Sequence, residues 1–448
     1  MAMCRILKEK GYRVAPFKAM NMSLNSISTE KGEEISRAQW LQAKAAGIEA
    51  DWRMNPILLK PEGMGASQVI SCGKSLGKMT ISEYGDFLRN RGKESVREAL
   101  SSLLDEYDFV VGEGSGSCAE INLYDRDISN TWLTEEFKGT GILVTNIENG
   151  GSFASLYGTK RLAQYPDTIR YFVINNMRGN SQMLSKGIDF IEADTGMKCL
   201  GIIPHIEHNL PGEDSLDYSN AGHGKISVVK YPFFENYSDL DYLRAIGNCK
   251  YVVKPDDIDD ADWIILPGSK NVKEDMEYLK KTGLWERIIG FMASGGNILG
   301  ICGGFQILSK NIDFKDGNGK RKGMGFLDVD FEYSQRKTVK RVEYEGELNG
   351  NKFRGKGYEI RFGYVSRRAC KNFIMADGSE EGAISPDGRI IGTNIHGILE
   401  NREFLNNVLG IPVEEDYSAI LNRDLDNFSH TVSANLKTSV LSQIINEY

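Results

Sequence analysis

Short runs of β-branched residues alternate with longer helical stretches along most of this 448-residue chain. Parallel strands need a crossover between them, usually a helix, so this alternation predicts mainly parallel sheets covered by helices. In the first half we expect helices at 33–47 and 95–107, and strands at 13–16, 109–112, 141–145, 168–174 and 200–203. The fold class that follows is α/β.

The length of the chain exceeds what one ordinary hydrophobic core holds, which predicts two domains. The stretch 208–224 is polar, rich in glycine and without a strand pattern, so we place the boundary there. The first domain then spans 1–215 and the second 225–448. In the second we expect strands at 225–231, 263–266 and 297–300, a β-rich section over 325–396 and a final polar helix.

Charge and composition argue against several classes of protein. A formal net charge of −8 disfavours nonspecific nucleic-acid binding, which needs a basic face. The longest apolar runs suit buried strands rather than a membrane span, and the first residues carry no signal-peptide pattern. Seven cysteines without a CxxC pair fit reduced thiols, so we expect a cytoplasmic protein. His205 and His208 lack a neighbouring cysteine, and we expect no protein-bound zinc.

The sharpest local signal is the segment Gly-Ile-Cys-Gly-Gly-Phe-Gln at 300–306. An apolar run leads directly into Cys302 and a helical pattern follows, which is the order of a nucleophile elbow with cysteine in place of serine. A helix N-terminus favours the thiolate, the reactive form of the side chain. We expect the amide of Gly303 to hold the oxyanion of a tetrahedral intermediate, with a second donor from the turn at Gly268.

A cysteine nucleophile needs a base, and His396 is the predicted one because it follows a short strand and lies among small residues. Together these motifs resemble the class I (triad) glutamine amidotransferase domain, and within it the cobyric acid synthase family. The resemblance implies a flavodoxin-like second domain that hydrolyses glutamine. The wider family usually has a Glu two residues after the His, where this chain has Ile398; the cobalamin-pathway members are known for lacking that Glu. What orients His396 stays open, with Glu400 as one candidate.

The first half carries the run Pro-Phe-Lys-Ala-Met-Asn-Met-Ser-Leu-Asn-Ser at 16–26. A strand ends in Lys18, a point cation suited to phosphate, and the short amide of Asn21 follows. A polar loop after a strand is the other interpretation of these residues. The run as a whole is very near the signature of the same synthases, and the first half resembles their dethiobiotin-synthetase-like P-loop domain, which binds nucleotide and corrinoid.

Glu113 ends a further apolar run among glycines. A carboxylate in that place suits a Mg²⁺ ion that bridges nucleotide phosphates, and the resemblance implies the same role. The resemblance also implies that Asp125 and Asp127 lie near the reacting carboxylate of the substrate, although a charged turn would explain these two residues as well. Asn175 matches a position that reads the adenine edge in the family.

No G-x-x-x-x-G-K-[ST] phosphate loop occurs in the sequence. In the resembling family this loop lies just before the helix that begins here near residue 2. We therefore expect the first strand and the loop, roughly twenty residues by the usual length of that unit, to be missing. A start site placed too far downstream explains this, and a protein with a dead synthetase half is the alternative.

The resemblance implies a glutamine-hydrolysing amide ligase of cobalamin biosynthesis that uses ATP with Mg²⁺. It would amidate the b, d, e and g side chains of adenosylcobyrinic acid a,c-diamide and give adenosylcobyric acid. A cobyrinic acid a,c-diamide synthase-like enzyme is one alternative; a glutaminase or ligand-binding protein without synthetase activity is another. We expect small-molecule partners, no nucleic acid and no membrane, and the sequence leaves room for a homo-oligomer.

Overall fold

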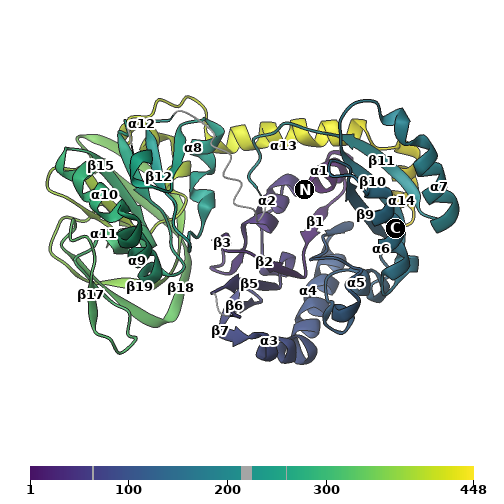
Figure 1. The fold of residues 1–448 in the computed structure, drawn as a ribbon, viewed down its shortest axis with the longest axis horizontal. Coiled ribbons are helices and arrows are strands. Elements are labelled where there is room, and N and C mark those ends of the chain that lie inside the picture. The colour runs from purple at the N-terminus through teal and green to yellow at the C-terminus, as the bar shows by residue number, and fades with distance from the viewer. Residues whose placement is uncertain (63–64, 213–223, 259) are drawn as a thin grey trace.

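The computed structural model describes residues 1–62, 65–212, 224–258 and 260–448. It places two α/β halves side by side (Figure 1). The stretch predicted to mark the boundary, 208–224, lies largely outside the described residues, so the division at 1–215 and 225–448 stays a prediction. Within the described ranges, no helix combines the length and the apolar character that crossing a membrane requires.

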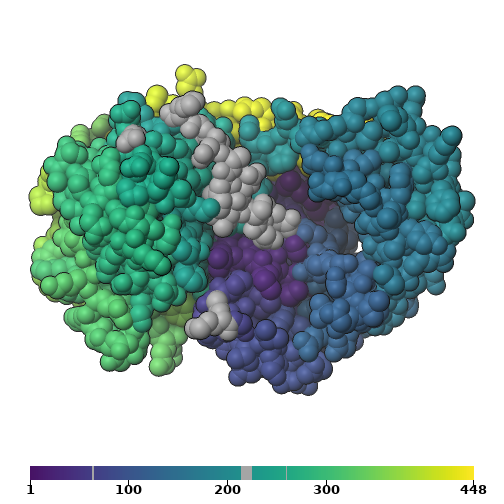
Figure 2. All heavy atoms as spheres, in the orientation of Figure 1, coloured from purple at the N-terminus to yellow at the C-terminus, as the bar shows by residue number. Residues whose placement is uncertain are grey.

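The first half is built around two small parallel sheets. Strand β1 (Val14–Phe17) pairs with β8 (Phe109–Gly112). Strand β10 (Ile169–Met177) lies between β9 (Gly141–Asn146) and β11 (Lys198–Pro204). All five strands overlap predicted ones. Figure 2 shows a recess in the surface between the purple residues near the N-terminus and the teal residues of this second sheet.

Two further sheets were not predicted. Strands β2 (Met20–Met22), β5 (Ile57–Pro61), β6 (Ala66–Ser71) and β7 (Lys74–Thr80) form one of them. In the other, β3 (Ser26–Ser28) pairs antiparallel with β4 (Glu34–Ser36). The helix predicted over 33–47 was therefore too long: α2 spans Arg37–Ala46, because the Ser36 side chain accepts a hydrogen bond from the backbone of Ala38 and caps it.

The remaining helices of the first half cover these sheets. The predicted helix at 95–107 is α4 (Lys93–Glu106). The others are α1 (Ala2–Glu9), α3 (Ile81–Phe87), α5 (Thr131–Glu136), α6 (Ser152–Leu162) and α7 (Ser185–Thr195).

A six-stranded sheet forms the centre of the second half. Its order is β13 (Cys249–Val252), β12 (Ile226–Val229), β14 (Trp263–Leu266), β15 (Asn297–Ile301), β23 (Ile390–Thr393) and β22 (Ala383–Ile384), and only β22 runs antiparallel. The strands predicted near 225, 263 and 297 are confirmed. Around the sheet lie α8 (Asp241–Ala245), α9 (Val272–Thr282), α10 (Leu284–Ala293) and α11 (Gly303–Leu308).

The β-rich section of the second half is dominated by one long hairpin of β18 (Val329–Leu348) and β19 (Asn351–Arg368). Its turn, Asn349-Gly350, has positive φ at both residues, 52° and 80°, as a two-residue hairpin turn requires. The short strands of this section are β16 (Asn311–Asp313), β17 (Lys320–Lys322), β20 (Ile374–Ala376) and β21 (Ser379–Glu381).

The last helices connect the two halves a second time. After α12 (Arg402–Asn407), helix α13 (Tyr417–Ala434) runs along the top of Figure 1 from the second half to the first. It begins in the core shared with the second half, where Leu421 and Leu425 are buried. Beyond it, Leu436 and then Leu441 of α14 (Thr438–Asn446) enter a hydrophobic cluster with residues of α1, β10 and β11. The first half thus completes its core with the end of the chain.

Candidate active site

Cys302 and His396 meet because their strands are neighbours. Strand β15 runs parallel to β23, with Ile301 opposite Thr393. Parallel strands present their carboxyl ends at one edge of a sheet, and Cys302 directly follows β15, while His396 follows β23. The backbone N–H of Cys302 donates to the carbonyl oxygen of Thr393 over 2.7 Å.

Cys302 occupies a strained turn between strand and helix. Its φ of 51° and ψ of −102° lie outside the usual regions for a residue with a side chain, as at other nucleophile elbows. A Cβ on Gly304 would lie 1.8 Å from the carbonyl oxygen of Leu266, and one on Gly303 would lie 2.6 Å from Ser269. The elbow therefore packs directly on the turn after β14, which only glycine permits.

His396 is held by its backbone and by its ring. Its backbone N–H donates to the backbone carbonyl oxygen of Tyr358 over 2.8 Å, and the Tyr358 ring stacks on the imidazole with centroids 5.2 Å apart. The Cys302 side chain is hydrogen-bonded to the ring. Burial lowers the pKa of His396, but the charge and hydrogen bond of Asp239 and the neighbouring Cys302 outweigh it, and the pKa is raised to about 10.

Asp239 orients the imidazole, and the sequence analysis did not find it. Its Oδ2 lies 2.8 Å from Nδ1 of His396, and its Oδ1 accepts a hydrogen bond of 2.8 Å from the backbone N–H of Gly397. Both side chains are 1% exposed. Asp239 belongs to a short 3-10 helix, η6 (Tyr237–Leu240), after the first strand of the second half. Cys302, His396 and Asp239 thus form the chain of nucleophile, base and orienting carboxylate that a thiol hydrolase needs.

Glu400 lies elsewhere. Its carboxylate pairs with Arg37 of the first half at 2.8 Å, and the geometry therefore favours Asp239 as the orienting group. One sequence signal was available: an acidic residue in the loop that follows a buried strand, ten positions after Val229. Nothing local indicates that this loop returns to a histidine 157 positions away.

Gly268 and Gly303 border the cysteine and the histidine. A Cβ on Gly268 would lie 3.3 Å from Cε1 of His396 and 2.8 Å from the carbonyl oxygen of Glu235. The amide of Gly303 lies at the first position of α11. Both glycines are thus placed beside the reacting atoms, and their role as oxyanion donors stays a prediction.

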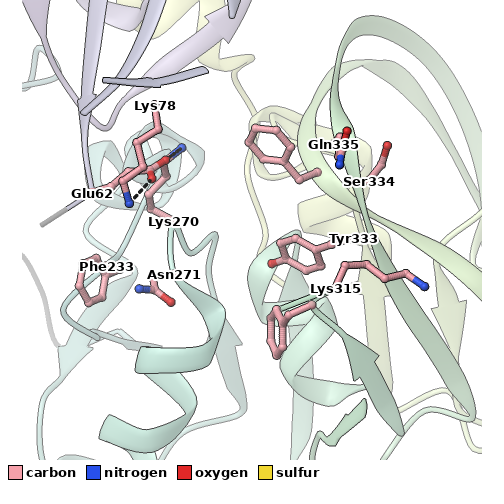
Figure 3. A pocket seen from close by; sticks show the side chains of 11 residues that line it. Glu62, Lys78, Phe233, Lys270, Asn271, Lys315, Tyr333, Ser334 and Gln335 are labelled. Carbon is pink, nitrogen blue, oxygen red and sulfur yellow. Dashed lines mark ion pairs between the residues drawn. The ribbon is translucent and has the colours of Figure 1, made fainter. Parts of the chain in front are cut away.

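A pocket of about 590 Å³ lies between the two halves, next to the turn after β14. Figure 3 shows Lys270 and Asn271 on one wall, Tyr333 on the other, and Glu62 and Lys78 reaching in from the first half. Glu62 and Lys270 form an ion pair at 3.2 Å. The hydroxyl of Tyr333 donates to Oε1 of Gln306, which lies on the first turn after Cys302. The pocket is therefore bounded by both halves, and Tyr333 connects its wall to the helix that follows the nucleophile.

In the first half the structure brings Lys18 and Glu113 together. They follow the paired strands β1 and β8, and Nζ of Lys18 lies 2.6 Å from Oε1 of Glu113. The side-chain amide of Gln42 donates to the other carboxylate oxygen over 2.6 Å. No cluster of three or more His, Cys, Asp or Glu side chains that could hold a metal occurs in the described part of the chain. The role of Glu113 as a Mg²⁺ ligand stays a prediction, and in this structure its two carboxylate oxygens are bonded to Lys18 and Gln42.

The other predicted residues of this half lie on separate elements. Asn21 donates to Oγ of Ser36 over 2.7 Å and is buried. Asp127 accepts from the backbone N–H of Ser129 at 2.9 Å, which makes it part of a turn. Asp125 is largely exposed, and Asn175 lies near the end of β10. Their binding roles stay predictions.

Both parts of the chain match known families. Residues 1–213 match the family described as CobQ/CobB/MinD/ParA nucleotide binding domain. Residues 225–404 match the family described as CobB/CobQ-like glutamine amidotransferase domain.

Relatives cover the chain almost end to end. A "Probable cobyric acid synthase" from Thermoplasma acidophilum is 45% identical over 98% of this chain and 95% of its own length. One of the same name from Picrophilus torridus is 43% identical over 100% of this chain and 96% of its own length. A "Cobyric acid synthase" from Vibrio campbellii is 36% identical, covering 98% and 96%. The chain therefore belongs to the cobyric acid synthase family of glutamine-hydrolysing amide ligases.

Proposed function

We propose that this chain uses ATP and glutamine to amidate the b, d, e and g side-chain carboxylates of adenosylcobyrinic acid a,c-diamide, giving adenosylcobyric acid. The observation that carries the proposal is the set of Cys302, His396 and Asp239, assembled in one chain with the Lys18–Glu113 pair of a nucleotide-binding half. The first set liberates ammonia, and the second belongs to the half that activates a carboxylate.

Ammonia comes from attack of Sγ of Cys302 on the side-chain amide of glutamine. His396 accepts the thiol proton and returns it to the departing nitrogen, which leaves a glutamyl thioester and free ammonia. Water, deprotonated by the same imidazole, then hydrolyses the thioester to glutamate. Asp239 keeps the ring in the tautomer with its proton on Nδ1, so that Nε2 is the base.

Glutamine enters through the pocket between the halves. Lys270 offers a cation for the α-carboxylate and Glu62 an anion for the α-ammonium, since the two already pair at 3.2 Å. The amide end then points toward Gln306 and the elbow. Because Glu62 belongs to the first half, the affinity for glutamine in this mode of binding depends on how the two halves are arranged.

In the first half, Lys18 would bind phosphate and Glu113 would hold Mg²⁺, which would supply positive charge to the phosphoryl group during its transfer. The phosphorylated corrinoid carboxylate accepts ammonia and releases phosphate. Lys18 is 8% exposed, so its ammonium is largely shielded from water and acts strongly on a nearby phosphate.

The test follows corrinoid masses after incubation with ATP, Mg²⁺, glutamine and adenosylcobyrinic acid a,c-diamide. We expect successive carboxylate-to-amide conversions. Cys302→Ala abolishes them with glutamine and keeps them with ammonium salts. Conversion limited to the a and c positions of the unamidated corrinoid would identify a cobyrinic acid a,c-diamide synthase instead.

A further inference from the structure

Residues 24–26 of the first half, the docking loop, bind the segment that carries Asp239. The backbone N–H of Asn236 donates to the oxygen of Leu24 over 3.3 Å, and that of Ser26 donates to Oδ1 of Asn236 over 3.1 Å. The N–H of Ser238 donates to Oδ1 of Asn25 over 3.4 Å. The end of the family run 16–26 therefore contacts the segment that carries Asp239.

These contacts fix the orientation of the Asn236 side chain. A backbone N–H only donates, so the Asn236 atom that faces Ser26 is the amide oxygen. The amide nitrogen then faces Nε2 of His396 at 3.3 Å and donates to it. Asn236 is 1% exposed, so no solvent competes for this hydrogen bond.

The amide of Asn236 competes with the Cys302 thiol for the lone pair on Nε2 of His396. Nδ1 of His396 is bonded to Asp239, so the proton of Cys302 must arrive at Nε2. In an imidazolium, the Nε2–H would face the amide hydrogens of Asn236. Two hydrogen-bond donors would then face each other, which is unfavourable. The contact thus opposes formation of the reactive thiolate and imidazolium, which the charge of Asp239 favours.

Lys60 braces both sides of this contact. It is fully buried, donates to Oγ of Ser26 over 2.7 Å and pairs with Glu34 at 3.0 Å, and it also forms an ion pair with Glu235, the neighbour of Asn236. Loss of Glu34 or Glu235 would take one of its two counter-charges from the buried Lys60. These linked contacts would therefore break together if the docking loop moved away from the Asn236 segment.

We propose that the docking loop, acting through Asn236 as a positioning residue, restrains the base His396 until substrates bound near Lys18 move the loop. The trigger rests on the proposed function, because Lys18 and the docking loop belong to the same run of the first half. The restraint itself needs only glutamine to be observed.

The first test is Asn236→Gly, which removes the amide and tolerates the left-handed backbone at this position, φ 54°. One net hydrogen bond corresponds to about 3- to 10-fold, so glutaminase turnover with glutamine alone should rise by that factor. ATP, Mg²⁺ and corrinoid should stimulate the wild type by a similar factor and the variant hardly at all. The matched control is Asn349→Gly, an exposed turn asparagine with φ 52°, which should leave turnover unchanged.

The second test, Asn236→Asp, keeps the shape and the hydrogen bond from Ser26 but offers a carboxylate oxygen to Nε2. The groups facing the ring are then Asp239, Cys302, the stacked Tyr358 and the new carboxylate. Inactivation of Cys302 by iodoacetamide should shift to lower pH by about one unit, because a hydrogen bond to a charged group stabilises the imidazolium.

Basal turnover in Asn236→Gly at or below the wild-type value would overturn the proposal, as would an unchanged alkylation profile in Asn236→Asp. The second result decides the matter if the first variant does not fold. A failure of corrinoid amidation would contradict the proposed function, yet leave both glutamine-only readouts intact, so the two failures are distinguishable.

Discussion

The orientation of His396 by Asp239 predicts a large loss of glutaminase activity in Asp239→Asn. The backbone N–H of Gly397, 2.8 Å from Oδ1 of Asp239, can only donate. The amide oxygen of the variant therefore turns to Gly397, and its NH2 group faces Nδ1 of His396. Nδ1 then becomes an acceptor, the ring proton moves to Nε2, and the base is lost.

The magnitude follows from the two buried hydrogen bonds that must be given up to restore the reactive tautomer. Each leaves a buried group unsatisfied at a cost of about 1–3 kcal/mol. A factor of ten corresponds to about 1.4 kcal/mol, so kcat should fall between about 30-fold and 10⁴-fold. KM for glutamine should change little, because Asp239 does not line the pocket.

The assay measures glutamate release with a coupled dehydrogenase, together with ammonia-dependent amidation as a check that the first half is intact. Glu400→Gln is the matched control, since Glu400 was the candidate suggested by the sequence and pairs with Arg37 instead. An Asp239→Asn enzyme that keeps more than a tenth of wild-type kcat would refute the reasoning, as would a larger loss in Glu400→Gln.

Three further outcomes follow from the packing and the buried charges. Gly304→Ala should destabilise the second half by more than about 3 kcal/mol in urea denaturation, because the added Cβ would lie 1.8 Å from the carbonyl oxygen of Leu266. The control is Gly290→Ala in α10, where an added Cβ would have no atom within 4 Å. This variant should instead stabilise the second half by about 0.5–1 kcal/mol. Burial lowers the pKa of Lys337 to about 7. Between about pH 7 and the ordinary pKa of lysine, the unfolded state therefore binds more protons than the folded state, so stability rises with pH in that range. Lys337→Met should flatten this rise when the thermal midpoint is measured against pH. Leu441→Ala should cost about 2–4 kcal/mol in unfolding of the first half, followed by circular dichroism, and leave glutamine hydrolysis unchanged.

The strands and the nucleophile were predictable because their signals are local. Strand β14 is a buried apolar run that any sheet must cover, and the glycines around Cys302 indicate a sharp turn wherever they occur. The turn Asn349-Gly350 was an equally local hairpin signal that the sequence analysis did not use.

The remaining features depend on contacts between distant parts of the chain. Asp239 serves as the orienting group only because η6 folds back to the end of β23. Residues 34–36 have a helical pattern, yet they pair with 26–28 across a tight connection, and tertiary pairing overrides such short-range preferences. Asn236 carries no motif of its own, since both of its partners come from elsewhere in the chain.

The path of α13 has a consequence for biosynthesis. Of the helices described, α13 and α14 emerge last from the ribosome, yet the cluster around α1 and β11 is closed by Leu436 and Leu441. The half that is translated first therefore cannot finish folding until the whole glutaminase half has been made. Until then, the apolar side chains of this cluster stay exposed. During that interval it is a natural client for chaperones. A stop codon anywhere in α13 would release a glutaminase half with a largely finished core and a first half that cannot complete its own.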